Sequence, residues 1–365
     1  MVYWICFLLY ELSLLYLYKY TNNKKISLIL IATGLIYFAG FRDGLGVDYV
    51  GYATACEVNY ASQLYLFNFF NEPIYTFLQD WIYATQFSPV VFFTFMAIIT
   101  NVCIVSVYSK YEDFPLLIFI YIIYPSLYVS SFNIVRQFAA GAIFLMAIHI
   151  YRTDKKIWKY LILLMIAVMI HKSAIILLFV LLIKDNKINP WIWGGLVLGT
   201  LIVPITPILG SISPYLELLD YGSYLQYDET PISKTSLVNF FLHLIFFIFL
   251  FNTKKIKSLP NAGGCIFAIK MVGIFLMCYN ISANDLPIAY RMAIYFSLFT
   301  PILFIYLKEI IDPIIAKNII IVSLSILFTI GVLLNDSLIP DKMMPLNTIY
   351  DKSFNINYRE AYIIE

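Results

Sequence analysis

The sequence predicts an all-α integral membrane protein of about twelve transmembrane helices. Hydrophobic residues make up 61% of the 365 positions and charged residues only 13%, which is far from the balance of a soluble domain. Apolar runs long enough to cross about 30 Å of hydrocarbon recur along the whole chain. These runs are continuous rather than alternating, so they favour helices over the strands of a barrel.

Most of the twelve runs follow one another with short polar connections, and several are shorter than a membrane thickness by roughly a helical turn. A lysine-rich turn separates the first two, and proline or charged positions border most of the others. The predicted spans cover 2–18, 26–41, 89–108, 114–130, 138–150, 158–170, 173–183, 191–209, 236–251, 262–281, 292–307 and 316–334.

Basic residues give the orientation of these spans, because an excess of Lys and Arg in short connections marks the cytoplasmic side. The residues that fall in alternate connections are Lys19, Lys24, Lys25, Lys110, Arg152, Lys155, Lys156, Lys159, Lys184, Lys187, Lys254, Lys255, Lys257, Lys308 and Lys317. Both termini are therefore expected outside. Met1 to Trp4 carry no basic segment, so no cleaved signal peptide is expected.

The chain is expected to form a single transmembrane domain over 1–334, followed by a polar outer tail over 335–365. Two outer connections are longer than turns, at 42–88 and 210–235. In the first, positions 72–81 place apolar residues at helical spacing, which indicates an amphipathic or re-entrant helix at the membrane interface. The five cysteines show no spacing typical of a disulfide framework or a metal site.

Three arginines lie at the outer face, where cations are generally avoided, and the first is Arg42. Gly44 and Gly46 after it permit tight turns that bring backbone N–H groups close to a ligand. The guanidinium of Arg42 suits a phosphate, and Asp43 and Asp48 can accept a proton or hold the arginine. The alternative is an ordinary helix-ending turn with an Arg–Asp pair.

The second cluster contains Asn133, Arg136 and Gln137, just before an apolar run. Asn133 and Arg136 are expected to share a helix face, with Ser131 or Asn133 capping the helix start. An arginine at a helix N-terminus favours an anion there. The alternative is a polar cap with an arginine that reaches to the interface.

His171 and Arg291 complete the outer set. His171 ends its span and can donate to a phosphate or take part in acid–base chemistry, although a histidine at a span end is also a common interfacial residue. Arg291 follows Tyr290 and precedes Tyr295 by about one turn.

Several other polar residues are expected to lie inside the helical bundle. His149 and His243 occur in apolar sequence, where neighbouring groups can satisfy them. Glu11 and Lys270 need partners at membrane depth, and an ion pair between them is one option.

Common catalytic motifs are missing from the sequence. It has no Asp-x-Asp, His-rich tract, P-loop or Gly-x-Ser-x-Gly, so no metal and no cofactor are expected. No basic groove for nucleic acid is visible either.

With these residues in place, the chain resembles the Wzy-type O-antigen and exopolysaccharide polymerases, in particular their EpsG-like branch. The resemblance covers most of the chain and rests on short motifs in a fixed order. These motifs are Phe41-Arg42-x-Gly44-x-Gly46-x-Asp48-Tyr49, Glu72-Pro73, Asn133-x-x-Arg136-Gln137, His171-x-Ser173 and Tyr290-Arg291 with Tyr295-Phe296. Lys172 and the polar tail depart from the family pattern.

The resemblance implies a GT-C-like membrane architecture and a glycosyltransferase of the bacterial cytoplasmic (inner) membrane, with its active site on the outer face. The substrate implied is an undecaprenyl-pyrophosphate-linked oligosaccharide, and repeat units would be joined by metal-independent, inverting transfer. Membrane lipids are expected partners, a polysaccharide chain-length regulator is a candidate partner, and nucleic acid is not expected.

The same resemblance gives the outer residues their roles. Asp48 and Glu72 are the candidate general bases, with Asp43 behind them, and Arg136 and His171 complete the catalytic set. The candidate binding residues for pyrophosphate and glycan are Arg42, Tyr49, Asn133, Arg136, Gln137, Arg291 and Tyr295. The alternatives are a flippase or exporter of lipid-linked glycans, an O-antigen ligase that uses the same donor, and a membrane O-acyltransferase.

Overall fold

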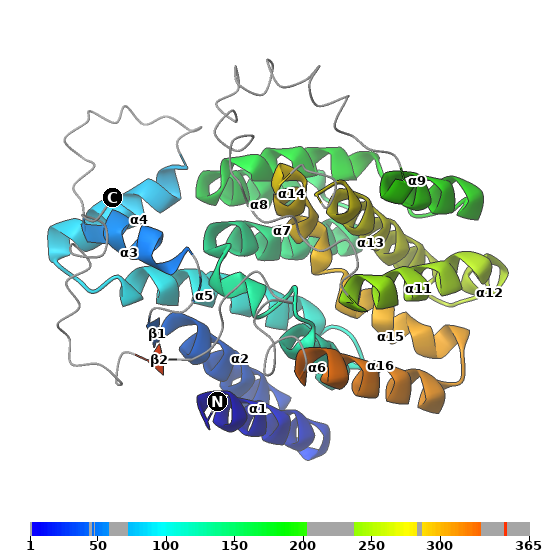
Figure 1. Ribbon diagram of the computed structural model, residues 1–365, viewed down its shortest axis with the longest axis horizontal. Coiled ribbons are helices and arrows are strands. Elements are labelled where there is room, and N and C mark those ends of the chain that lie inside the picture. Colours follow the sequence, from blue (N-terminus) through cyan, green and yellow to red (C-terminus); the bar gives the residue numbers. More distant parts are fainter. Residues whose placement is uncertain are drawn as a thin grey trace. The chain divides into compact units, whose positions relative to one another are not determined.

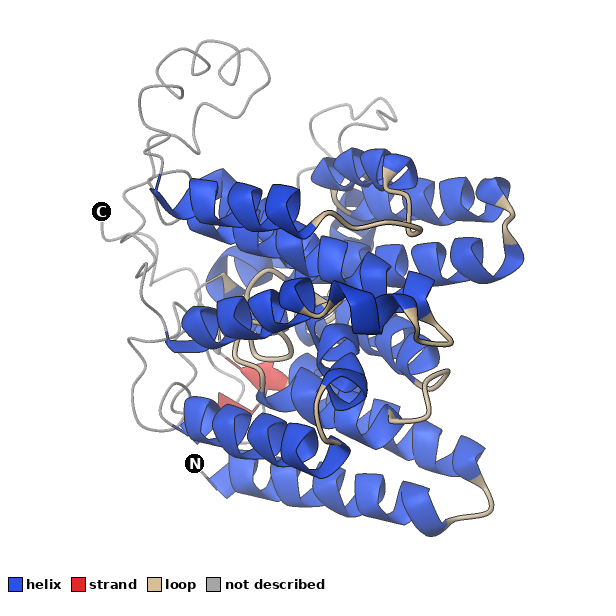
Figure 2. Cartoon of the chain, turned by 90° about the vertical axis from the view of Figure 1, so that its right-hand side faces the viewer, coloured by secondary structure: helices blue, strands red, loops and turns tan. Residues whose placement is uncertain are grey.

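The computed structural model describes residues 2–43, 46, 48–57, 72–202, 237–282, 287–329 and 347–348. The described residues are overwhelmingly helical, in agreement with the predicted all-α class (Figure 2). The strands are two residues each: β1 (Arg42–Asp43) pairs antiparallel with β2 (Asn347–Thr348). The chain divides into two compact units, one formed by Met1–Leu178 with Phe328–Glu365 and the other by Phe179–Leu327.

The first unit is built around helices that pack side by side (Figure 1). α7 packs against both α5 and α8, α5 packs against α2, and α2 packs against α1. The short helix α4 lies against α3, α5 and α8. The helices are α1 (Val2–Tyr20), α2 (Lys24–Gly40), α3 (Tyr49–Glu57), α4 (Pro73–Thr85), α5 (Val90–Tyr108), α6 (Phe114–Ile123), α7 (Val135–Asp154) and α8 (Ile157–Ile170), with a 3₁₀ turn η2 (Ser130–Phe132).

The second unit is organised around α13, which packs against α9, α11, α14 and α15. The 3₁₀ helix η3 (Lys172–Leu182) follows α8 in the sequence. It contains the position in the chain, Leu178–Phe179, at which the first unit ends and the second begins. The helices that come after it are α9 (Pro190–Ile202), α11 (Leu237–Phe251), α12 (Thr253–Lys257), α13 (Ala262–Ser282), α14 (Pro287–Ser297), α15 (Thr300–Ile310) and α16 (Pro313–Phe328).

Two predicted spans are interrupted by proline. The predicted span 114–130 ends as a helix at Ile123, because Tyr124 takes an extended conformation before Pro125. The predicted span 292–307 divides into α14 and α15, which meet at an angle of 54°, with Pro301 in the first turn of α15. The predicted span 173–183 is the 3₁₀ helix η3 rather than an α-helix.

Helix length supports fewer spans than the predicted twelve. Among the described residues, α5 and α13 are long and apolar enough to cross a membrane, and the bent pair of α14 and α15 brings this to at most three. Six further apolar helices are 10–17 residues long. The chain has the helices of a membrane protein, but about twelve spans, a GT-C-like architecture and one domain over 1–334 stay predictions.

The helix expected at 72–81 is confirmed as α4, whereas its place at the membrane interface stays a prediction. Its inner face buries Leu78, Gln79 and Ile82, while Phe77 is 70% exposed and Trp81 41% exposed on the other side. The second connection, 210–235, and all of the tail except Asn347–Thr348 lie outside the described residues.

Candidate functional site

The candidate site begins at Glu72, the residue immediately before α4. Glu72 has φ 54° and ψ 61°, which is the left-handed region, and it precedes Pro73. A residue with a side chain is unfavourable there by about 1–2 kcal/mol, and a following proline restricts it further. Strain of this kind persists where surrounding contacts hold it, and it concentrates at functional sites.

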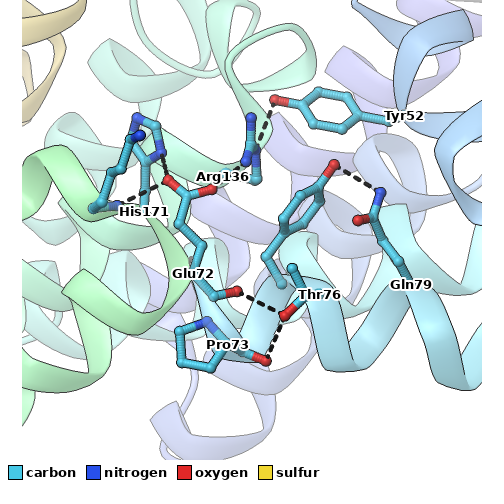
Figure 3. Close-up of polar contacts among 9 residues, drawn as sticks. Tyr52, Glu72, Pro73, Thr76, Gln79, Arg136 and His171 are labelled. Atoms are coloured by element: carbon cyan, nitrogen blue, oxygen red, sulfur yellow. Dashed lines mark hydrogen bonds and ion pairs between the residues drawn. The ribbon is translucent and has the colours of Figure 1, made fainter. Parts of the chain in front are cut away.

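Contacts on both carboxylate oxygens hold Glu72 in place (Figure 3). Oε1 lies 2.6 Å from Nδ1 of His171 and accepts a 2.9 Å hydrogen bond from the backbone N–H of Lys172. Oε2 forms an ion pair with a terminal nitrogen of Arg136. Glu72 therefore joins the start of α4, the start of α7 and the end of α8 within the first unit.

Arg136 lies in the first turn of α7, and two tyrosines of the first outer connection contact it. Its Nε donates a 3.4 Å hydrogen bond to the hydroxyl of Tyr52, and its guanidinium lies 4.1 Å from the centre of the Tyr75 ring. The hydroxyl of Tyr75 in turn accepts a 2.7 Å hydrogen bond from Gln79. Stacking on an aromatic ring fixes both the position and the plane of a guanidinium group. The direction in which the N–H donors of Arg136 point is therefore fixed.

His171 is placed by the end of α8. Its backbone is extended, and its N–H still donates to the carbonyl of Ala167 as the helix stops. The side chain of His171 is 13% exposed, that of Arg136 23% and that of Glu72 9%. The carboxylate is thus the inner member of the group, and the two cationic or protonatable side chains lie nearer the surface.

The electrostatics of the group favour an ionised carboxylate. Burial raises the pKa of Glu72, but the hydrogen bond with His171 and the charge of Arg136 outweigh it, so its pKa lies below the usual range. An ion pair this sheltered is costly to break, because removing one partner leaves a buried charge without compensation.

Arg42 occupies a different environment from Arg136. Its side chain is only 2% exposed and donates to the carbonyls of Ala39 and Phe132, the latter at 2.7 Å. The rings of Phe93 and Phe132 lie 4.5 and 5.1 Å from its guanidinium carbon. Burial lowers the pKa of Arg42 to about 10, so it stays cationic near neutral pH. These contacts tie the end of α2 to the segment before α7.

Most of the other predicted binding residues are buried. Tyr49 is 1% exposed and stacks on Phe93 at 4.5 Å, Asn133 is 3% exposed, and Gln137 is 1% exposed. Asp48 is exposed, at the turn that starts α3.

The remaining predicted binding residues are in α14 of the second unit, where Arg291 is half-buried and Tyr295 fully buried. The structure brings Glu72, Arg136 and His171 together. The roles predicted for the other residues stay predictions.

The expected cap of α7 is not formed. The helix begins at Val135 after Ile134, without a side-chain cap, and Ser131 donates instead to the carbonyl of Tyr128. Asn133 precedes the helix, so it does not share a helical face with Arg136. The reason is the tight 3₁₀ turn at Ser130–Phe132, which uses these residues before α7 starts.

Two of the polar residues predicted to lie inside the helical bundle, Lys270 and His243, have polar partners within the second unit. Lys270 donates to the carbonyl of Lys184, so the pair with Glu11 is not needed to hold its ammonium. Asn280 lies 3.2 Å from Nε2 of His243, which confirms that this histidine is satisfied within the bundle.

Three supports of the site were not predicted from the sequence, namely Tyr52, Tyr75 and the backbone N–H of Lys172. The structure packs Tyr52 and Tyr75 on the guanidinium of Arg136. The backbone N–H of Lys172 was not expected at all. The spacing of Tyr75 three residues after Glu72, on the same helical turn, was the available signal.

Among the residues that the structure describes, no group of three or more His, Cys, Asp or Glu side chains is placed to hold a metal ion. The site is instead a guanidinium and an imidazole arranged about one carboxylate. This group lies at helix ends of a protein whose apolar helices are those of a helical membrane protein.

The sequence model of the EpsG family matches residues 25–348, and the chain belongs to the EpsG family. The match covers most of the chain and includes Glu72, Arg136 and His171. Membership indicates a role of the polysaccharide-polymerase type at a membrane. No curated protein and no solved structure matches the chain.

Proposed function

We propose that the protein is a glycosyltransferase that polymerises undecaprenyl-pyrophosphate-linked oligosaccharide repeat units at the outer face of the bacterial cytoplasmic membrane. The observation that carries this proposal is the Arg136 guanidinium in the first turn of α7, which Tyr75 and Glu72 hold in a fixed orientation. Family membership supports the reaction type, and Arg136 supports the leaving group.

The reaction needs a cation where charge develops. A hydroxyl oxygen of one repeat unit attacks the anomeric carbon of another, a new C–O bond forms, and the bond to the pyrophosphate oxygen breaks. The electron pair leaves with the lipid pyrophosphate, and the hydroxyl proton passes to a base. Arg136 stabilises the departing charge by charge-assisted hydrogen bonds from its fixed fork. Displacement in one step inverts the anomeric centre.

The ion pair with Glu72 occupies only some of the hydrogen-bond donors of Arg136. One terminal nitrogen meets Glu72 and Nε meets Tyr52, and the side chain remains 23% exposed. A guanidinium carries five N–H donors, so the remaining donors are available to a phosphate group. Arg42, which is almost fully buried, is proposed to hold the backbone beside the site rather than to touch the substrate.

Reconstitution of the purified protein in liposomes tests the proposal. With lipid-linked repeat units as the sole substrate, polymer is expected together with released undecaprenyl pyrophosphate. Movement of intact units across the bilayer without polymer would instead identify a flippase. Transfer that requires an added non-identical lipid acceptor would identify a ligase.

Arg136→Lys is the informative variant. Lysine keeps a positive charge beside Glu72 but lacks the planar fork and the stacking on Tyr75, so polymer yield is expected to fall at least about tenfold. Arg136→Ala should abolish polymer. Lys159→Met is the matched control, since Lys159 forms an exposed ion pair with Asp154 elsewhere. A normal polymer yield from a well-folded Arg136→Lys protein would contradict the proposed role of Arg136 in stabilising the departing pyrophosphate.

A further inference from the structure

The carboxylate of Glu72 is poorly suited to take a proton. Oε1 accepts hydrogen bonds from His171 and from the Lys172 backbone, and Oε2 meets Arg136. Its pKa lies below the usual range because these contacts outweigh burial. A base that is already saturated with donors gains little from protonation. Glu72, one of the bases expected from the sequence, is therefore a weak candidate.

The same contacts determine which nitrogen of His171 carries a proton. An ionised carboxylate at 2.6 Å from Nδ1 accepts a hydrogen bond, so Nδ1 bears the hydrogen. In the neutral ring the lone pair then resides on Nε2, at the opposite edge of the imidazole. A carboxylate on the far nitrogen also stabilises the imidazolium that forms when Nε2 takes a proton.

The position of Glu72 is itself fixed, and this keeps the His171 imidazole in one orientation. The left-handed backbone before Pro73 directs the side chain toward His171 (Figure 3), and the Lys172 N–H donates to Oε1, the oxygen that also meets His171. The charged groups near His171 in the described part of the site include Glu72 ahead of α4, Arg136 from α7 and Lys172 of its own segment.

On these contacts, and resting on the proposed polymerase function, we propose that Nε2 of His171 is the general base that deprotonates the attacking sugar hydroxyl. Glu72 is its positioning residue. The hydroxyl proton moves to Nε2 as the oxygen bonds to the anomeric carbon, and the imidazolium then releases that proton to water. The single carboxylate of Glu72 contacts both Arg136, which stabilises the leaving pyrophosphate, and His171, which takes the proton. It therefore fixes the positions of these two side chains relative to each other.

His171→Asn provides the sharpest test, because the asparagine amide can still donate to Glu72 from the place of Nδ1 while nothing replaces Nε2. In the purified protein, kcat is expected to fall about 10²–10⁴-fold, the usual contribution of a general base. Binding of undecaprenyl pyrophosphate alone, used as the probe, should change less than about threefold, because the Arg136 clamp remains. His149→Asn is the matched control, since His149 lies within α7 away from this group.

Glu72→Gln tests the positioning role by the pH dependence of kcat/KM. In the wild type, kcat/KM should fall on the acid side as His171 becomes protonated. The amide removes the negative charge that favours the imidazolium, so this fall should move to lower pH while the plateau rate decreases at least about tenfold. Glu72→Asp should restore part of the rate, and a merely structural role would leave the position of the fall unchanged.

The outcomes separate this inference from the proposed function. An unchanged kcat in His171→Asn, or an acid-side fall that moves in Asp48→Asn and not in Glu72→Gln, would overturn the assignment of the base while polymerisation stood. Absence of polymer from the wild-type protein under all conditions would overturn the polymerase proposal itself.

Discussion

The ion pair between Glu72 and Arg136 should dominate the stability of the first unit around the site. Single substitutions Glu72→Ala and Arg136→Ala each leave a sheltered charge without its partner. Breaking a buried pair in this way typically costs about 3–5 kcal/mol. The Arg136 side chain is 23% exposed, so solvent screening places the expected cost near the lower end, about 3 kcal/mol.

The double substitution is expected to be less costly than the sum of the two single ones. With both charges removed, neither is left buried alone, and His171 loses only its hydrogen-bond partner. The coupling free energy from the double-mutant cycle should therefore reach about 1–3 kcal/mol. By the usual relation between stability and melting temperature, each single substitution should lower the Tm by at least about 5 °C.

Thermal unfolding of the purified protein in detergent, followed by intrinsic fluorescence, measures all four corners of the cycle. Lys159→Ala, Asp154→Ala and their double form the matched cycle, because that exposed pair should show coupling below about 1 kcal/mol. If the Glu72 and Arg136 effects were additive within about 0.5 kcal/mol, the pair would not be the structural centre described above.

Two further predictions follow from backbone and charge. Gly46→Ala should destabilise the protein by at least about 1 kcal/mol, because Gly46 has φ 105° and a Cβ there would lie 2.4 Å from the Asn133 side-chain oxygen. Gly51→Ala, with open space around it, should leave the Tm unchanged or raise it, and equal effects would refute the argument. The lowered pKa of Glu72 contributes stability that is present above its unfolded pKa and is lost as pH falls through the folded value. The Tm difference between wild type and Glu72→Gln should therefore shrink on acidification, and a difference that grows toward acid pH would contradict this sign.

Local sequence patterns were sufficient to predict the helices and the class of protein. Continuous apolar runs require backbone hydrogen bonds to be satisfied within the segment, and only a helix does this in hydrocarbon. The helix at α4 could likewise be predicted, because the 3.6-residue periodicity of its apolar positions is a local property. Where helix bounds differ, as at Tyr124 before Pro125, the cause is a backbone restriction that hydrophobicity does not register.

Only the tertiary structure decided which polar residues form a group. Glu72 is 64 positions from Arg136 and 99 from His171, and no periodicity links residues so far apart. Arg42 and Arg136 occur in similar sequence contexts, yet packing buries Arg42 among aromatic rings and backbone carbonyls and leaves Arg136 partly exposed beside a carboxylate. Residue type sets what a side chain can do, but burial and neighbours set which charge is structural and which is available to a substrate.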